Sequence, residues 1–321
     1  MSVTIHDLAR LAGVDASTVS RALHDDPRIS AKTKERIRTL AEQQGDVMNL
    51  AARNLAAGKT NMVALVMDTV VSQLRTVPAA ALNDVLAEHG YTLMILLHSG
   101  TRQSLEHCIS KLEQKICDAA VMIPPVDQCL TPDLVRRIKN LTIPFSFLDC
   151  WKPEAQRPTV TTHVEQSIRM LMDRVRPERP EAAFLMTPAR NSVSQERFQW
   201  ATRLLDERGV PWLAHSDALP AFIRDKHVST LAVFADSPWH TDQSLQTITA
   251  PHPPRVIGAM FDPWENYPPH DYDKIFLCIQ NFPEIGRQTA KLILELLNHQ
   301  KPEADFIQIP PLEIRTIPGN L

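Results

Sequence analysis

The first 45 residues of the chain carry apolar side chains at helical spacing in three short groups. The first group ends at Gly13, the second runs from about residue 15 to 23, and the third runs from Ser30 to Gly45. Asp15 and Ser30 are residue types that commonly cap the start of a helix, and glycine commonly ends one. The pattern predicts three helices, the first two joined by a tight glycine turn, as in a helix-turn-helix domain.

The second predicted helix, ASTVSRAL at 16–23, presents small polar and basic side chains on its outward faces. Ser17, Ser20 and Arg21 fall there, and such side chains can approach phosphates and the edges of bases. The same pattern also fits a three-helix bundle with an ordinary solvated face. On the residues alone, DNA binding is the favoured interpretation.

A segment rich in alanine and leucine, NLAARNLAAGK at 49–59, follows the three helices. It would form fewer than three helical turns, which are marginal in water without a partner. We therefore expect residues 49–57 to become ordered only against a partner. The AAGKT sequence resembles the end of a phosphate-binding loop, but Arg53 stands where that motif needs a glycine, which excludes the loop.

From residue 62 onward, short apolar runs alternate with helical stretches. The runs have the composition of buried parallel strands. They are residues 62–68, 92–98, 118–124, 145–149, 182–186, 230–236 and 255–261. Helical periodicity lies between them, over about 76–89, 101–115, 131–140, 163–174, 195–208 and 284–299. This alternation predicts a doubly wound α/β architecture, and roughly 260 residues fit two such sheets better than one.

Several of the predicted strands end at a polar residue. These residues are Asp68, His98, Asp149, Asp236 and, one position beyond its strand, Asp262. Ligands of doubly wound folds bind in a crevice outside the carboxyl ends of the strands. A small-molecule site is therefore expected at these positions.

The composition is that of an ordinary globular chain, with 44% hydrophobic and 22% charged residues among 321. It excludes a disordered chain and a disulfide miniprotein. No apolar run reaches the roughly 18–20 residues of a membrane span, and no signal peptide is recognisable. Five cysteines at irregular spacing favour reduced, mostly buried thiols. We expect a cytoplasmic protein with no membrane partner.

The net charge of −3 is distributed unevenly along the chain. Residues 1–60 hold nine Lys and Arg against seven Asp and Glu, whereas the remainder holds 25 against 30. A mildly basic head on an acidic body is a weak indication of a nucleic-acid contact at the head.

With these motifs in view, the chain resembles the LacI/GalR family of transcriptional repressors over its whole length. The head carries the most specific segments: DLARLAGV, STVSRAL and ISAKTKERI within residues 4–37. LAAGKT at 55–60 is similar to the hinge of that family. In the body, the similar segments are EHGYTLMI at 88–95, IPFSFLD at 143–149 and FPEIGRQTAKLILELL at 282–297.

The resemblance implies a domain plan and a set of partners. It implies a helix-turn-helix domain at 1–46, a hinge helix and linker at 47–60, and an effector-binding and dimerisation domain at 61–321. The body would have the periplasmic-binding-protein fold, with two subdomains that the chain crosses three times. We place one at about 61–158 and 282–304, and the other at about 159–281 and 305–321. The implied partners are operator DNA, a sugar or sugar-derived effector and a second copy of the chain, without a cofactor. Because no heptad helix follows the last predicted strand, we expect a dimer.

The resemblance also implies which residues bind DNA. Ala16, Ser17 and Arg21 occupy the base-reading positions, and an arginine can hydrogen-bond both O6 and N7 of guanine. The positions that contact phosphate or the linker region are Thr4, Thr18, Ser20, Ser30, Thr33 and Asn49. Leu55 matches the hinge leucine that wedges into the minor groove and kinks the DNA.

For the effector, the resemblance matches three residues to cleft positions by their place in the sequence, Asp149, Arg197 and Asp262. Two further candidates are Arg75, near the predicted mouth of the cleft, and Asp236, which stands with Ser237 where the family usually has Asn-Asp. Carboxylates paired with an arginine suit polyol recognition, because both make planar bidentate hydrogen bonds. Arg75 could instead serve a phosphate.

The chain departs from the family pattern in ways that bear on the effector. It lacks the usual Tyr-x-Pro-Asn before the hinge, where Asp46-Val47-Met48-Asn49 stands, and it has 25 prolines against nine glycines. The missing aromatic and proline concern the packing of the linker, whereas scarce glycine and abundant proline fit bulkier cleft loops. The departures at Trp200, Asp236 and Ser237 indicate a narrower pocket, so we expect common hexoses to fail and a smaller acidic or phosphorylated metabolite to be at least as good a candidate.

Three functions compete on these grounds. The first is a DNA-binding regulator with a small-molecule effector. The second is such a regulator with a degenerate cleft, controlled by a protein partner or constitutive. The third, an enzyme, is disfavoured because the sequence contains no HExxH, GxSxG, GxGxxG or CxxC motif.

Overall fold

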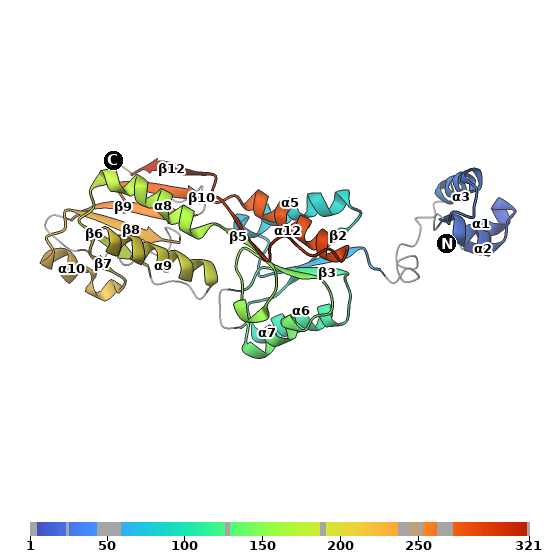
Figure 1. The fold of residues 1–321 in the computed structure, drawn as a ribbon, viewed down its shortest axis with the longest axis horizontal. Helices are drawn as coiled ribbons and strands as arrows, with labels where there is room; N and C mark the ends of the chain where they lie inside the picture. Colours follow the sequence, from blue (N-terminus) through green and yellow to red (C-terminus); the bar gives the residue numbers. More distant parts are fainter. Residues whose placement is uncertain are drawn as a thin grey trace. The chain divides into compact units, whose positions relative to one another are not determined.

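The computed structural model describes residues 5–23, 26–43, 59–125, 129–186, 191–236, 245, 248, 253–261 and 272–319. The chain divides into two compact units, residues 1–61 and residues 62–321 (Figure 1).

The first unit contains a bundle of three helices, α1 (Ile5–Ala12), α2 (Ala16–Leu23) and α3 (Ala31–Gln43). Their apolar faces enclose one small core, which includes Leu8, Val19 and Ile37, each at most 1% exposed. Helices of this length are marginal alone in water, so the shared core holds them together. The predicted three-helix head is confirmed.

The second unit contains two six-stranded sheets. The first sheet has the strand order β11-β5-β4-β3-β1-β2, with all neighbours parallel. Its strands are β1 (Met62–Met67), β2 (Thr92–Leu97), β3 (Ala119–Met122), β4 (Phe145–Leu148), β5 (Thr159–Thr162) and β11 (Phe306–Ile309). Helices α5 (Gln73–Glu88) and α12 (Phe282–Leu297) pack on one face, and α6 (Arg102–Glu113) and α7 (Pro132–Lys139) on the other (Figure 1).

The second sheet has the order β12-β10-β9-β8-β6-β7, parallel except for β12, which pairs antiparallel with β10. Its strands are β6 (Ala182–Leu185), β7 (Trp212–Leu213), β8 (Thr230–Ala235), β9 (Arg255–Phe261), β10 (Lys274–Ile279) and β12 (Glu313–Pro318). Helices α8 (Val164–Val175) and α9 (Ser192–Glu207) cover one face, and α10 (Leu219–Asp225) lies on the other. The predicted α/β body with two parallel-sheet subdomains is confirmed.

The chain passes between the two sheets after β5, after β10 and after β11. We expected the first passage at about residue 158 and the last at about 304. The structure corrects both limits, because β5 pairs with β4 and β11 pairs with β5, so both strands belong to the first sheet. The sequence of β5, TVTT, is fully buried but mostly threonine, so a search for apolar runs does not find it.

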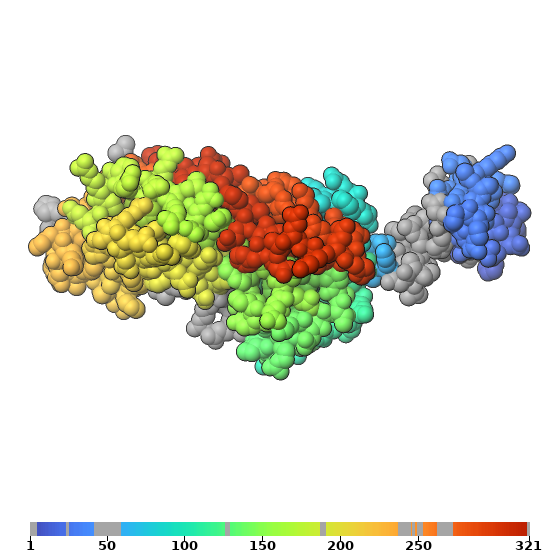
Figure 2. Space-filling model, in the orientation of Figure 1, coloured from blue at the N-terminus to red at the C-terminus, as the bar shows by residue number. Residues whose placement is uncertain are grey.

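The first subdomain is therefore assembled from both ends of the body. Helix α12 lies along α5, and the two approach closely at Gly286, where an added Cβ would stand 2.2 Å from the carbonyl oxygen of Pro78 (Figure 1). In Figure 2, the late segments drawn in orange and red lie against the early ones drawn in cyan and green. None of the helices in the described part of the chain is long and apolar enough to cross a membrane.

Candidate functional site

The turn between α1 and α2 fixes the geometry of the head. Gly13 has a φ of +64°, a conformation that glycine adopts without steric cost. The Val14 amide donates to the carbonyl oxygen of Ala9 at 3.1 Å, and the Val14 side chain packs against the head core. The sharp turn therefore sets α2 at an angle to α1 with its outer face free of the bundle.

Helix α2 turns its polar and basic residues outward. Val19 and Ala22 are completely buried, while Ser17 and Arg21 are exposed. The remaining predicted DNA contacts of this helix are half-buried; they are Ala16, Thr18 and Ser20. The five residues therefore lie on or beside one accessible face, as a recognition helix requires.

Ser30 and Thr33 stand at the start of α3. The Ser30 Oγ accepts a hydrogen bond from the Thr33 amide at 3.2 Å and lies 2.8 Å from the Thr33 Oγ1. Ser30 is thus a helix cap, as its residue type predicts. Ser30 is also exposed at a helix N-terminus, where backbone amides favour an anion such as phosphate.

Four of the predicted site residues lie outside the described residues. They are Thr4, Asn49, Leu55 and Asp262. The predicted hinge segment at 49–57 also lies outside them, so its ordering on DNA stays a prediction.

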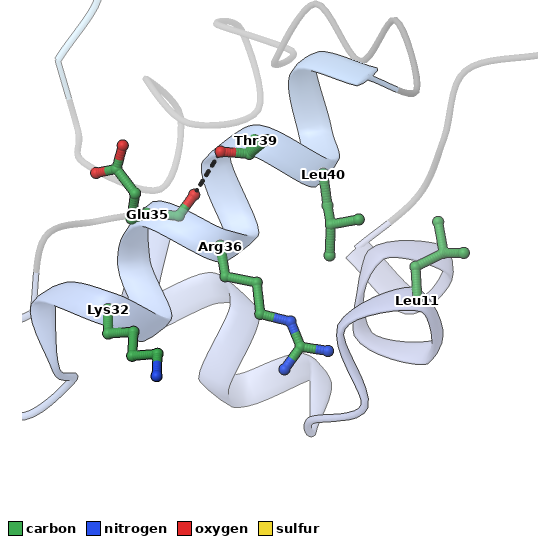
Figure 3. Close-up of a pocket in the computed structure, with 6 residues that line it drawn as sticks. All are labelled: Leu11, Lys32, Glu35, Arg36, Thr39 and Leu40. Atoms are coloured by element: carbon green, nitrogen blue, oxygen red, sulfur yellow. Dashed lines mark hydrogen bonds between the residues drawn. The ribbon is translucent and has the colours of Figure 1, made fainter.

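A groove of about 440 Å³ lies between α1 and α3 on the head. Figure 3 shows Leu11 of α1 and Leu40 of α3 beside this space, with the Arg36 side chain extending along it. Lys32, Glu35 and Thr39 complete the lining, and none of these residues is a predicted DNA contact. The groove is therefore separate from the outward face of α2.

In the body, the first cluster of charged groups stands at the carboxyl ends of β1 and β2. The Arg75 Nε donates to the Asp68 Oδ1 at 2.9 Å, and the Arg75 side chain is only 12% exposed. Burial is the largest single influence on Arg75 and opposes its charge, but the hydrogen bond to Asp68 and the nearby charges of Asp68 and Asp149 together outweigh burial and raise the pKa of Arg75. His98 follows β2, is buried, and burial lowers its pKa. Arg75 is thus a predicted residue already paired with a carboxylate.

A second cluster stands at the carboxyl ends of the second sheet. The buried Arg197 donates through Nη1 to the Asp236 Oδ1 at 2.9 Å, and its guanidinium lies 3.7 Å from the ring centroid of Phe261. The Ser194 hydroxyl donates to the other Asp236 oxygen. Arg197 and Asp236 are among the predicted site residues, whereas Ser194 and Phe261 are not, because only the fold brings these two residues to the pair.

Asp149 lies between the two clusters. It follows β4 with a φ of +66°, and its amide donates to the Val160 carbonyl at 2.8 Å. Burial raises the pKa of Asp149, and the charges of Arg75 and Arg197 act in the opposite direction. The structure therefore brings together Arg75, Asp149, Arg197 and Asp236 at the facing ends of the two sheets.

The segment after β4 also joins the subdomains directly. The Trp151 amide donates to the Ser192 hydroxyl of α9 at 2.9 Å, and the Trp151 ring packs against the cores of both sheets. Among the described residues, no group of three or more His, Cys, Asp and Glu side chains could hold a metal ion. The chemistry of the site is hydrogen bonding by carboxylates and guanidinium groups beside an aromatic ring, which fits a small polyhydroxylated molecule.

Comparison with known proteins assigns the family. A model described as bacterial regulatory proteins, lacI family, matches residues 4–45. The maltose regulon regulatory protein MalI of Vibrio furnissii is 30% identical over 107 residues, which are 33% of this chain and 78% of that protein. The chain belongs to the LacI family. The MalI protein of Escherichia coli strain K12 is also 30% identical, over 199 residues, which are 62% of this chain and 53% of that protein.

The chain spans about half the length of the first curated relatives it matches. Its fold is shared with a crystal structure of the Lac repressor dimer bound to operator and the anti-inducer ONPF, with a TM-score of 0.74. That match covers 99% of this chain and 98% of the other at 16% sequence identity. The LacI-family relatives that the chain matches are named as regulatory proteins or transcriptional regulators and not as enzymes.

Proposed function

We propose that this chain is a sequence-specific DNA-binding transcriptional repressor that works in the cytoplasm as a homodimer. Its affinity for an operator would be set by a small metabolite, a sugar, sugar phosphate or sugar acid, bound between the two sheets. The observation that carries this proposal is the outward polar face of α2, held by the Gly13 turn within the segment that matches the LacI-family model.

The homodimer is supported by an apolar surface on the first subdomain. Strand β2 is an edge strand, and its Ile95 and Leu97 are 45% and 52% exposed. Val71 and Val77, at the start of the α5 region that packs on β2, are also exposed. Monomeric proteins rarely expose contiguous apolar surface beside a free strand edge. We assign this surface to a second copy of the chain.

The effector site is supported by the charged groups at the facing ends of the sheets. Asp149 and Arg75 come from the first subdomain, and Arg197 and Asp236 from the second. A ligand that hydrogen-bonds both sets would hold the subdomains together, and that closure would act on the hinge. Relatives named for the maltose regulon support a sugar-type ligand.

The DNA-binding part is tested with Arg21→Ala. A palindromic operator is first selected from randomised duplexes with the wild-type chain, since a dimer's symmetry is mirrored in its site. Loss of a bidentate base contact should weaken operator binding by about 1–3 kcal/mol and relax one base position. Fluorescence anisotropy measures both, and unchanged affinity would remove α2 from the interface.

The effector part is tested by calorimetry with sugars, sugar phosphates and sugar acids. Arg197→Ala and Asp149→Asn should each abolish the heat of binding of the true ligand. Coupling between the two sites is also reciprocal: if a ligand weakens operator binding tenfold, the same ligand must bind tenfold more weakly to the operator complex than to the free protein.

A degenerate cleft is the second candidate, because Arg75 and Arg197 are both already paired with carboxylates. In that case no compound of the panel would raise the melting temperature.

A further inference from the structure

Residues 26–29, which follow α2 in the chain, form a tight turn that is hydrogen-bonded to the end of that helix. The Ile29 amide donates to the Asp26 carbonyl at 3.0 Å, which closes a four-residue turn with Pro27 at its second position. Proline fixes the backbone there at the φ that this turn needs. The Asp26 amide donates to the Arg21 carbonyl at 3.0 Å, and Ile29 packs against the head core. The turn is therefore held against the end of α2 and the head core.

Arg28 in this turn is held by bidentate hydrogen bonds to the carboxylate of Asp26. The Arg28 Nε lies 3.0 Å from the Asp26 Oδ1, and the Arg28 Nη2 lies 2.6 Å from the Asp26 Oδ2. The Arg28 amide also donates to the Asp26 Oδ1 at 2.9 Å. The Arg28 side chain nevertheless stays 73% exposed, while that of Asp26 is only 15% exposed. Asp26 thus lies behind the guanidinium and leaves it accessible.

The two hydrogen bonds to Asp26 leave a second edge of the Arg28 guanidinium available for hydrogen bonding. An arginine has five N–H donors, of which Asp26 takes one on Nε and one on Nη2. The remaining three lie on Nη1 and Nη2, and they form the fork that matches O6 and N7 of guanine. A side chain that is already held loses less conformational entropy on binding than a free one.

An ordinary stabilising role does not require this arginine to be so accessible. Solvent screens a guanidinium that is 73% exposed, so the charge attraction adds modestly to the stability of the head. The hydrogen bond from Arg28 lowers the pKa of Asp26 well below its usual value, and the charge of Arg21 acts in the same direction. Asp26 is therefore ionised at any pH at which the head works, and it stands close to both arginines.

We propose that Arg28, oriented by Asp26, is a second base-reading arginine beside Arg21 and specifies a guanine in each operator half-site. Arg28 contacts the base, and Asp26 is a positioning residue. The inference rests on the proposed DNA-binding function. Neither Asp26 nor Arg28 is among the DNA contacts predicted from the sequence.

The test measures base preference at every operator position. The full-length chain is incubated with half-site duplexes that carry each single base change, and binding is followed by anisotropy at several salt concentrations. The variants are Arg28→Lys, Arg28→Ala and Asp26→Asn. Arg10→Ala is the matched control, because Arg10 pairs with Asp7 at 3.1 Å on α1 of the same head and is equally accessible. Circular dichroism confirms that each head is folded.

Both Arg28 variants should reduce the preference for one guanine by about tenfold, at a position distinct from that read by Arg21. Arg28→Lys keeps the charge but loses the fork, so it should behave like Arg28→Ala in preference. Asp26→Asn should reduce the preference at the same position by a smaller factor, and Arg10→Ala should leave it unchanged.

Other outcomes overturn the inference. If Arg28→Ala weakens all duplexes equally and lowers the salt dependence by about one phosphate contact, while Arg28→Lys restores both, Arg28 binds the DNA backbone instead. An unchanged preference in Asp26→Asn overturns the positioning role. If the wild-type chain selects no sequence at all, the proposed function itself is wrong, which is a different result from the loss of one position.

Discussion

At the scale of single residues, the site in the body is organised around carboxylates that differ in their surroundings. Asp68 and Asp236 each accept a hydrogen bond from an arginine. Asp149 has only the Cys150 thiol as a side-chain donor to its carboxylate among the described contacts, at 3.8 Å, and burial raises its pKa. Asp149 is therefore the carboxylate with most to gain from the donors of a ligand.

Asp149→Asn should stabilise the ligand-free body at neutral pH. The folded-state pKa of Asp149 lies above the usual value of 3.8, so the folded protein releases this proton later than the unfolded chain. Stability from this group is therefore present below pH 3.8 and is lost as the pH rises through the folded-state pKa. The amide removes that loss, and the melting temperature should rise by about 2–4 °C for each kcal/mol gained.

The measurement is thermal unfolding between pH 4 and pH 8, with Asp84→Asn on the exposed face of α5 as the control. If the melting temperature of Asp149→Asn changes with pH in the same way as that of the wild type, ionisation of Asp149 does not destabilise the folded body.

At the scale of elements, the close packing of α5 against α12 completes the core of the first subdomain. Helix α5 contains Pro78, which is buried, and the Pro78 carbonyl faces Gly286 of α12. The absence of a side chain at this crossing lets the two helices and the sheet below share one core, to which Leu82 and Ile293 contribute.

Gly286→Ala should destabilise the body although alanine is the better helix former. Alanine is favoured over glycine by about 1 kcal/mol in a helix. The new Cβ would stand 2.2 Å from a backbone oxygen that cannot rotate away, and overpacking costs about 1–3 kcal/mol. Denaturant unfolding should show a net loss, whereas Lys291→Ala on the exposed side of α12 should not. Equal or greater stability of Gly286→Ala would mean that the helices separate freely.

The elements also show what the sequence can and cannot predict. Strands with an unbroken apolar run, such as Met62–Met67 and Thr230–Ala235, are recognisable because both of their faces are buried. Lys274–Ile279 has such a run as well and could have been found. Phe306–Ile309 and Glu313–Pro318 are edge strands with exposed positions, so they lack that pattern. The Arg197–Asp236 pair joins residues far apart in sequence, and only the shared sheet edge brings them together.

At the scale of the whole molecule, the proposed function depends on surfaces that the single chain leaves open. The outward face of α2 and the apolar edge at β2 belong to different units of the chain. A palindromic operator requires two heads, so the proposed pairing of bodies through β2 would be a condition for tight DNA binding.

Leu97→Glu should therefore produce a monomer. A charge in the middle of the proposed contact must be desolvated on association, which opposes dimer formation. Sedimentation should show half the wild-type mass, and operator affinity should fall by at least about tenfold, since the second half-site no longer benefits from linkage. Leu312→Glu is the control. Leu312 precedes β12 of the second sheet, away from β2, and its side chain is 57% exposed, against 52% for Leu97. A dimeric Leu97→Glu variant would exclude the β2 surface.

The assembly of the first sheet from both ends of the body has a consequence during synthesis. The head can fold as soon as its own residues have left the ribosome, because its core is entirely local. The first sheet must wait for α12 and β11, more than 100 residues after β5, and until then the apolar face that α12 covers is open to the solvent. Nascent chains would therefore carry a folded head and an incompletely folded body. At this stage, chaperones and proteases have most access to the protein.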